Sequence, residues 1–360
     1  MASTLDYVLI LGVAIACVYI IYRMIKKQQA SSPSAASPPP YSDTPSAAQM
    51  SQLNKIENTK LGSGITSMQI DMSGDYSLRN YCIKSSFNSA YTGSYVNRNM
   101  VKYVLSRGCR FLDFEVYVKD GIPIVAYSTA QYDPSFTHFT SKSPAISLDG
   151  VCSTIMANAF TETSPNPADP LFVQLRIKTY LQSAYSSIAQ TIMSTLSDKL
   201  YQGTVTMDTP LPSLMGKIVL IVDKSSSPGY PTAVANACSP GDATCYNLSS
   251  LVNMESGGEV VRVYRANDLM NQSINPPDPN VYLMRIVLPT VGFFYGVQNS
   301  DAYYLIQNYG AQVVAQVFYI NNGALGVYED LFRNFKSAFV PIPAALQYIE
   351  AQNTALGINS

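Results

Sequence analysis

Residues 107–117 read RGCRFLDFEVY, and this stretch decides the fold. Apolar side chains surround two carboxylates, Asp113 and Glu115, which are two residues apart. Because side chains alternate between the two faces of a strand, both carboxylates lie on the same face. Unpaired carboxylates are costly to bury, so this face must line a barrel interior or a functional site. We therefore interpret the stretch as a buried strand that carries a site.

Apolar runs of this kind recur along the chain and alternate with segments of helical periodicity or with loops. Near-continuous apolar strands separated by helices are typical of a parallel sheet that is covered on both faces. At 360 residues, one closed barrel is a simpler account than two domains. The sequence therefore predicts an α/β protein with a TIM-type (β/α)8 barrel over residues 61–350 and a tail over residues 351–360. The runs are Tyr81–Lys84, Cys109–Val116, Pro123–Tyr127, Leu171–Ile177, Lys217–Val222, Val260–Tyr264, Val281–Leu288 and Val313–Tyr319.

The composition limits the classes of partner. Apolar residues make up 47% of the chain, charged residues only 13%, and the net charge is −1. Such a chain has no basic field for binding nucleic acid. The six cysteines form no zinc-binding pattern, so no metal or cofactor is expected. Cys238 and Cys245 are interpreted as a reduced pair, with a disulfide as the alternative because they are close enough in sequence to bridge.

The N-terminal segment, residues 1–27, is predicted to be a transmembrane anchor. Tyr7–Ile25 is almost wholly apolar and long enough to cross a bilayer as a helix. Arg23, Lys26 and Lys27 lie at the end of this run, which places the rest of the chain on the cytosolic side. A cleaved secretory signal, the alternative, would carry its basic residues before the apolar run.

Residues 28–60 are rich in proline, serine and alanine and are predicted to be a disordered tether. Within this tether, Pro38, Pro39, Pro40 and Tyr41 match the PPxY ligand of WW domains, which bind a preformed polyproline helix. A proline-rich tether produces such a string easily, so a chance match is the alternative interpretation.

Seven segments in order along the chain resemble motifs of the catalytic barrel of phosphoinositide-specific phospholipase C. The resemblance covers about residues 61–349 and implies that the barrel has this family's fold. The segments are SSFNSAY (Ser85–Tyr91), GCRFLDFE (Gly108–Glu115), GIPIVAYST (Gly121–Thr129), DPLFVQLRIK (Asp169–Lys178), LMGKIVLIVDK (Leu214–Lys224), YGAQVVAQVFY (Tyr309–Tyr319) and FVPIPAAL (Phe339–Leu346).

The resemblance also implies where catalytic groups would lie. In that family, two histidines on opposite sides of the phosphodiester transfer protons during its cleavage. The matching positions hold Phe87 and Thr129, and neither side chain transfers protons near pH 7. The loss of each acid or base costs roughly 10²–10⁴ in rate. The resemblance therefore predicts a catalytically inactive barrel.

Family members that use calcium hold the ion with an asparagine and three acidic residues. Asn88, Asp113 and Glu115 match three of these ligands, whereas Arg176 replaces the fourth. A guanidinium would repel a divalent ion and pair with the carboxylates. We expect an internal ion-pair network without a metal, with an anion or headgroup contact at Arg176 as the alternative. Some relatives use an arginine in place of calcium, so Arg176 alone does not exclude activity. The absence of both histidines nearly does.

Other residues carry weaker signals. His138, the chain's single histidine, follows the third predicted strand. Because loops at the C-terminal end of a barrel reach active sites, a relocated catalytic role is the alternative to an ordinary loop histidine. By resemblance, Lys224 matches one phosphate-binding lysine, whereas Ile221 and Asp223 stand where others are expected. The sequons for N-linked glycosylation are interpreted as chance matches in a cytosolic barrel; they are at Asn247 and Asn271.

These expectations lead to one principal function and two alternatives. The principal hypothesis is a membrane-anchored, catalytically inactive barrel with a structural role. Degenerate barrels with one N-terminal anchor also resemble minor capsid proteins of large nucleocytoplasmic DNA viruses. That likeness implies a place in the virion between inner membrane and capsid, with the bilayer and other capsid proteins as partners. The alternatives are a phosphoinositide or lipid-headgroup binding module and a weakly active phosphodiesterase.

Overall fold

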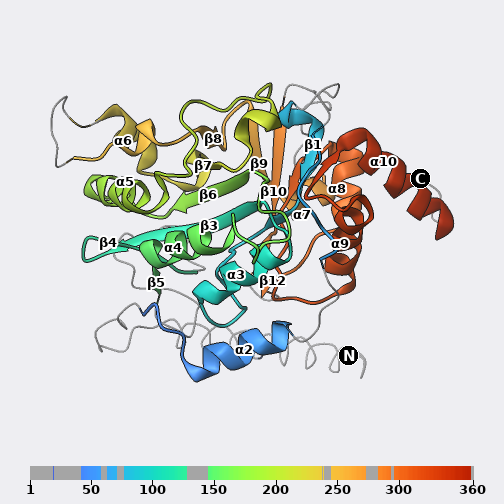
Figure 1. Ribbon diagram of the computed structural model, residues 1–360, viewed down its shortest axis with the longest axis horizontal. Coiled ribbons are helices and arrows are strands. Elements are labelled where there is room, and N and C mark those ends of the chain that lie inside the picture. The colour runs from blue at the N-terminus through green and yellow to red at the C-terminus, as the bar shows by residue number, and fades with distance from the viewer. Residues whose placement is uncertain are drawn as a thin grey trace, which may run out of the picture.

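The computed structural model describes residues 19, 42–57, 63–70, 77–127, 145–236, 238, 245–272, 283–292 and 296–357. Their centre is formed by strands that run parallel to one another in two sheets (Figure 1). The first sheet contains, in order, β1 (Tyr81–Ile83), β13 (Val313–Val314), β10 (Met284–Leu288) and β9 (Val261–Arg265). The second contains β2 (Ser85–Ser86), β3 (Phe111–Lys119), β6 (Leu171–Ile177), β7 (Ile218–Asp223) and β8 (Met254–Ser256).

The two sheets join along one side. β2 continues β1 after Lys84 and pairs with β3, and Ser86 forms a parallel bridge to Gln316 beyond β13. On the opposite side, β8 and β9 share no ladder among the described residues. The class predicted from the sequence, α/β, is confirmed. The arrangement fits a barrel that is closed at β2 and lacks ladder pairing between β8 and β9.

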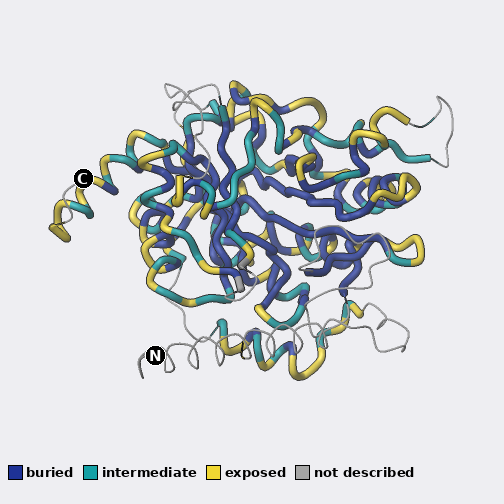
Figure 2. Tube along the Cα trace, turned by 180° about the vertical axis from the view of Figure 1, so that it is seen from behind, coloured by how far each residue is buried: buried dark blue, intermediate teal, exposed yellow. Residues whose placement is uncertain are grey.

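Helices cover the outside of these strands, and every residue of β6, β7 and β10 is buried (Figure 2). The helices of this layer are α3 (Arg98–Ser106), α4 (Leu148–Asn158), α5 (Gln182–Leu196), α6 (Tyr230–Ala235), α7 (Ala266–Met270), α8 (Ala302–Tyr309), α9 (Gly323–Phe335) and α10 (Ile342–Ala355). Short 3-10 turns occupy Leu78–Asn80, Leu211–Leu214, Lys224–Ser226 (η3) and Leu248–Ser250 (η4). Additional short strands are β4 (Ile122–Val125), β5 (Ile146–Ser147), β11 (Val291–Gly292), β12 (Gly296–Val297) and β14 (Phe339–Pro341).

Local chemistry sets the limits of these helices. In α3, the side chain of Asn97 accepts a hydrogen bond from the backbone N–H of Asn99, which caps the first turn. Helix α8 begins with the same device at Asp301 and ends at Gly310, whose φ of 58° suits glycine. Helix α10 continues to Ala355, so the predicted tail over residues 351–360 begins inside a helix.

The structure corrects one predicted barrel strand. Pro123–Tyr127 was expected to be a parallel strand, but β4 runs antiparallel to β3. Asp120 and Gly121 both have positive φ, 51° and 78°, as in a two-residue hairpin turn of type I′. Such a turn returns the chain directly along the strand it has left, so β4 forms a hairpin and β8 supplies the further parallel strand.

The predicted disordered tether over residues 28–60 is also corrected, from Ser42 onward. We call residues Ser42–Glu57 the N-terminal strap; it includes α2 (Ala47–Glu57), which packs against α3 (Figure 1). Leu53 is only 2% exposed, and Met50 and Ile56 pack beside it because apolar residues recur at helical spacing. The carboxylate of Asp43 accepts hydrogen bonds from the backbone N–H and hydroxyl of Ser147.

Two other predictions fall on residues that the structure does not describe. The apolar segment Tyr7–Ile25, apart from Tyr19, and the PPxY string at Pro38, Pro39 and Tyr41 lie outside the described residues. Within the described part of the chain, none of the helices combines the length and the apolar character needed to cross a bilayer. The transmembrane anchor therefore stays a prediction.

Candidate functional site

Arg176 lies at the centre of the predicted site. It comes from β6, and Asp113 and Glu115 come from β3; the parallel register places Glu115 opposite Arg176. Asp113 accepts two hydrogen bonds, from Nε at 2.8 Å and from Nη2 at 2.7 Å. Glu115 accepts from Nη1 at 2.6 Å. The ion pairing that the sequence predicts between Arg176 and the two carboxylates is therefore present in the structure.

Two residues of the loop after β2 complete this arrangement. The Oδ1 atom of Asn88 accepts a hydrogen bond from Nη2 of Arg176 at 2.6 Å. The ring of Phe87 lies against the guanidinium, with 4.7 Å between Cζ and the ring centroid. We call Phe87, Asn88, Asp113, Glu115 and Arg176 the Arg176 cluster. Of the residues predicted to form the site, only Thr129 is not placed here, because it lies outside the described residues.

The cluster is buried and ionised. The side chain of Arg176 is 1% exposed and that of Asp113 is fully buried. Burial disfavours the charged carboxylate, but the charge and hydrogen bonds of Arg176 outweigh it and lower the pKa of Asp113. Burial also disfavours the charged guanidinium, but the two carboxylates outweigh it and raise the pKa of Arg176. Both partners therefore stay charged across the physiological range.

This geometry limits the chemistry of the cluster. Each guanidinium nitrogen donates to Asp113, Glu115 or Asn88, and the Arg176 side chain is only 1% exposed, so the guanidinium is closed off from a phosphate in solvent. Phe87 stands at one position that the resemblance assigns to a proton-transferring histidine. Among the described residues, no cluster of histidine, cysteine or acidic side chains is arranged to hold a metal ion. The cluster is a buried ion-pair network of one guanidinium and two carboxylates.

Sequence reasoning missed several polar residues around the cluster. Gln174 donates to Oδ1 of Asp113 at 3.1 Å, and Ser256 donates to Oε1 of Gln174 at 3.0 Å. Lys178 is also buried; burial, followed by the charge of Arg176, lowers its pKa to about 8. Gln174, Arg176 and Lys178 are two residues apart along one strand. The alternation of side chains in β6 was a usable signal, because it places all three on one face.

The residues with weaker sequence signals lie in different surroundings. Lys224 pairs with Glu255 at 2.9 Å, and both side chains are about 40% exposed. Ile221 is a buried core residue of β7. Asp223 is buried and accepts a hydrogen bond from the backbone N–H of Ser225, which caps η3. His138 lies outside the described residues, so its role stays a prediction.

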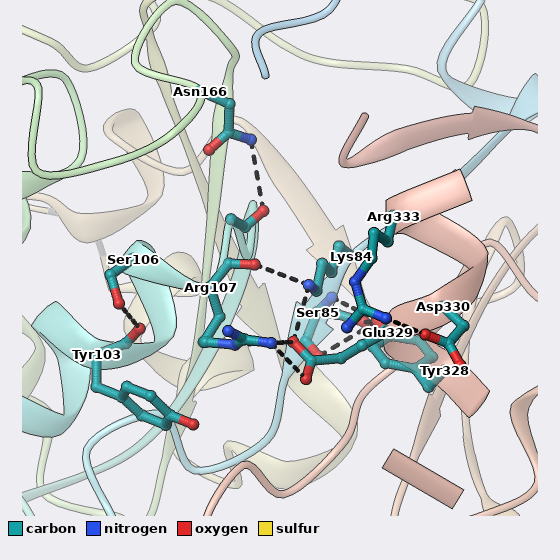
Figure 3. A network of polar contacts seen from close by, with 11 residues as sticks. Lys84, Ser85, Tyr103, Ser106, Arg107, Asn166, Tyr328, Glu329, Asp330 and Arg333 are labelled. Carbon is teal, nitrogen blue, oxygen red and sulfur yellow. Dashed lines mark hydrogen bonds and ion pairs between the residues drawn. The ribbon is translucent and has the colours of Figure 1, made fainter. Parts of the chain in front are cut away.

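A second buried ion-pair network was not foreseen from the sequence (Figure 3). Glu329 of α9 accepts from Nη2 of Arg107 at 2.7 Å and from Nζ of Lys84 at 3.1 Å. Lys84 also donates to the backbone carbonyl of Arg107 at 2.7 Å. Burial raises the pKa of Glu329, but the two cations outweigh it and lower that pKa overall. This network ties the joint between β1 and β2 to the end of α3 and to α9.

Comparisons with known proteins agree with this fold. Residues 75–224 match the family model of the phosphatidylinositol-specific phospholipase C, X domain. The structure of L. pealei PLC21 is 16% identical, with a TM-score of 0.55, over 79% of this chain and 39% of that chain. The structure of S. officinalis PLC21 is 17% identical, with a TM-score of 0.56, over 80% of this chain and 39% of that chain. At these identities, the structural likeness shows the fold alone.

The fold is similar to that of the two PLC21 structures, and residues 75–224 are similar to the X domain of phosphatidylinositol-specific phospholipase C. This chain contains a phospholipase C-like domain. It spans about two fifths of the length of the two PLC21 structures. None of the curated proteins matches the sequence.

Proposed function

We propose that the phospholipase C-like domain of this chain is catalytically inactive and works as a membrane-tethered structural module. The observation that carries this proposal is the closed Arg176 cluster. Arg176 is held by Asp113, Glu115 and Asn88 within hydrogen-bonding distance, and its side chain is 1% exposed. A site of this kind holds its own cation without a substrate or metal, and Phe87 supplies no proton to a leaving group.

The structural part of the proposal rests on the rest of the chain. The apolar segment Tyr7–Ile25 would hold the domain at a bilayer. With 26 tyrosines and only 13% charged residues, the surface suits contact with other proteins. By the resemblance noted above, we propose that these partners are capsid proteins of a virus particle with an inner membrane. The domain would then link that membrane to the capsid.

Activity is tested with the full chain in detergent micelles that contain phosphatidylinositol. We expect release of inositol phosphate to stay at the level of a protein-free blank, with and without calcium. His138→Ala serves as the variant that removes the chain's single histidine. Hydrolysis above the blank that disappears in this variant would overturn the proposal and support an active phosphodiesterase with a rearranged site.

The structural role has a separate test. Purified particles are stripped with a non-ionic detergent, and the residual shells are analysed by mass spectrometry. We expect the chain to remain with the capsid proteins after lipid removal. Complete loss of the chain with the lipid fraction would contradict the linking role, whatever the outcome of the activity assay.

Headgroup binding is the second candidate, because two further cations lie near Arg176. Arg176 contributes to lowering the pKa of both Lys178 and Arg265, which places positive charge beside the cluster. The test is flotation of the full chain with vesicles that contain or lack phosphatidylinositol bisphosphate. Binding that needs this lipid and is lost in Lys178→Gln, with an unchanged melting temperature, would favour this candidate over the structural role.

A further inference from the structure

The cysteines of the domain fall into two groups. Cys238 and Cys245 form a disulfide, with their Cα atoms 5.7 Å apart, and both residues are partly exposed. The remaining cysteines of the described chain are buried thiols, and burial raises the pKa of each to about 12; these are Cys82, Cys109 and Cys152. The described cysteines near the surface are therefore oxidised, and those that stay reduced are shielded in the core.

This division indicates the compartment in which the domain folds. Disulfides persist in oxidising compartments, whereas cytosolic glutathione and thioredoxin keep accessible thiols reduced. The basic residues after Tyr7–Ile25 predict the opposite, cytosolic, side of the membrane. The two indications conflict. In the cytosol, a partly exposed disulfide would have to persist against the whole reducing pool. In assigning the compartment we therefore give the disulfide greater weight than the basic residues.

One sequon lies next to this disulfide. Asn247 follows Cys245 by two residues and begins the sequence Asn-Leu-Ser. Its Oδ1 atom accepts hydrogen bonds from the backbone N–H of Ser249 at 3.2 Å and from the Ser249 hydroxyl at 2.7 Å. Its Nδ2 atom makes no hydrogen bond to any described residue, and the residue is half-buried beside η4. The folded domain can therefore accommodate a glycan on Nδ2 without breaking a hydrogen bond to a described residue.

We infer that this face of the domain, formed by α6, the Cys238–Cys245 disulfide and η4, matures in an oxidising compartment, and that Asn247 accepts an N-linked oligosaccharide there. The inference does not depend on the proposed loss of catalysis, and it places the domain on the side of the membrane opposite to the one assumed for the capsid-linking role. In that compartment a sequon at a surface turn is an acceptor for a glycan. The interpretation of this sequon as a chance match assumed a cytosolic domain.

Disulfide formation needs a thiol oxidase, and glycan transfer needs a lipid-linked oligosaccharide. The two thiols lose two protons and two electrons to the disulfide of a thiol oxidase, which becomes a dithiol. At Asn247, Nδ2 attacks the anomeric carbon of a lipid-linked oligosaccharide. The new C–N bond forms as the bond to the polyprenyl diphosphate breaks, and the amide loses one proton.

The experiment expresses the full chain in eukaryotic cells that perform N-glycosylation and follows its gel mobility before and after treatment with a peptide-N-glycosidase. We expect a glycosidase-sensitive form whose glycan at Asn247 disappears in Asn247→Gln and in Ser249→Ala. Ser249→Thr preserves the sequon and should retain the glycan. Asn271→Gln is the matched control at the other sequon and should leave the glycan on Asn247. Glycan transfer precedes folding, so an unstable variant still reports on the site.

The disulfide is measured on the same material by labelling denatured protein with a maleimide polymer before and after reduction. We expect two additional labelled thiols after reduction, and none in the double variant Cys238→Ser, Cys245→Ser. Labelling of both cysteines without reductant would overturn the compartment assignment. A disulfide in a chain whose mobility is the same in wild type and Asn247→Gln would overturn Asn247 as the acceptor.

Discussion

At Arg176, a guanidinium occupies the space between Asn88, Asp113 and Glu115, three side chains that offer oxygen atoms. The resemblance to phospholipase C implies an acidic residue at this position in relatives that bind calcium. A change of one side chain therefore replaces a dissociable ion with a covalently attached cation. Stabilisation that would otherwise need a bound metal is therefore part of the folding free energy of the domain.

Loss of Arg176 should destabilise the domain strongly. Arg176→Met removes the partner of two buried carboxylates, and breaking a buried ion pair in this way costs about 3–5 kcal/mol in the free energy of unfolding. Urea denaturation gives this value. Lys224→Met is the control, because its pair with Glu255 is about 40% exposed and exposed pairs contribute about 0–1 kcal/mol. Equal effects of the two substitutions would contradict the role given to Arg176.

A second substitution at Arg176 tests the origin of the cluster. Arg176→Glu would complete a set of one asparagine and three acidic side chains, which are the oxygen ligands that calcium prefers. We expect calcium to raise the melting temperature of this variant and to leave that of the wild type unchanged. Magnesium, which demands a smaller octahedral site, is the control ion. A variant that calcium does not stabilise would argue against an inherited ligand sphere.

At the scale of elements, the fold depends on contacts between segments that are distant in sequence. Lys84 and Arg107 meet Glu329 more than two hundred residues later (Figure 3). The N-terminal strap is joined to α4 by Asp43 and to the loop before α3 by Gln49, whose Nε2 donates to the carbonyl of Val96 at 3.2 Å. These contacts fasten the beginning of the domain to its later elements.

Asp330, the next residue along the chain, provides a matched control for the network around Glu329. Glu329→Gln leaves Lys84 and Arg107 buried without their carboxylate, so we expect a loss of about 3–5 kcal/mol in the free energy of unfolding. Asp330 pairs with Arg333 near the surface, and Asp330→Asn should cost less than about 1 kcal/mol. Chemical denaturation of the two variants gives the comparison. A small effect at Glu329 would mean that the network does not stabilise the domain.

The N-terminal strap should resist proteolysis as long as it is docked. Leu53→Ala creates a cavity beneath α2, which costs about 2–5 kcal/mol for a fully buried leucine. We expect faster cleavage within residues 42–57 in this variant, measured by limited proteolysis and mass spectrometry. Lys55→Ala is the control on the exposed face of α2. Rapid cleavage of the strap in the wild type would show that the predicted tether extends through it.

For the molecule as a whole, the buried charged groups determine how stability depends on pH. Asp113 and Glu329 have pKa values lowered by their cationic partners, so their stabilisation is present at neutral pH. It is lost as the pH falls below about 4, where these carboxylates take up protons in the unfolded chain and then in the folded one. We expect the free energy of unfolding to fall steeply in this range and to do so less in Glu329→Gln.

Lys178 gives a dependence of the same sign in the alkaline range. Burial lowers its pKa to about 8, whereas the unfolded value is about 10.4. Between these values, the unfolded chain binds more protons than the folded one, so Lys178 makes stability rise with pH. Thermal unfolding of the wild type and of Lys178→Gln from pH 7.5 to about 10 should show a difference that grows in favour of the wild type. A constant difference would place the Lys178 amine in contact with water.

Much of the fold was predictable because apolar periodicity is a local property. The run Leu171–Ile177 coincides with β6, and the runs near β7, β9 and β10 differ from the observed strands by a few residues at most. The hairpin at β4 was missed although Asp120–Gly121 is a strong hairpin signal. Strand β8 was missed because three residues are too short to give a period.

The sequence alone determined that Asp113 and Glu115 share one face of a buried strand, since alternation along a strand is fixed by the backbone. It also indicated, through the resemblance, that Arg176 faces them. The tertiary structure was needed to show that Lys84 and Arg107 meet Glu329 and that Asp43 binds Ser147 at the start of α4. These contacts join segments whose separation along the chain carries no information about their distance in space.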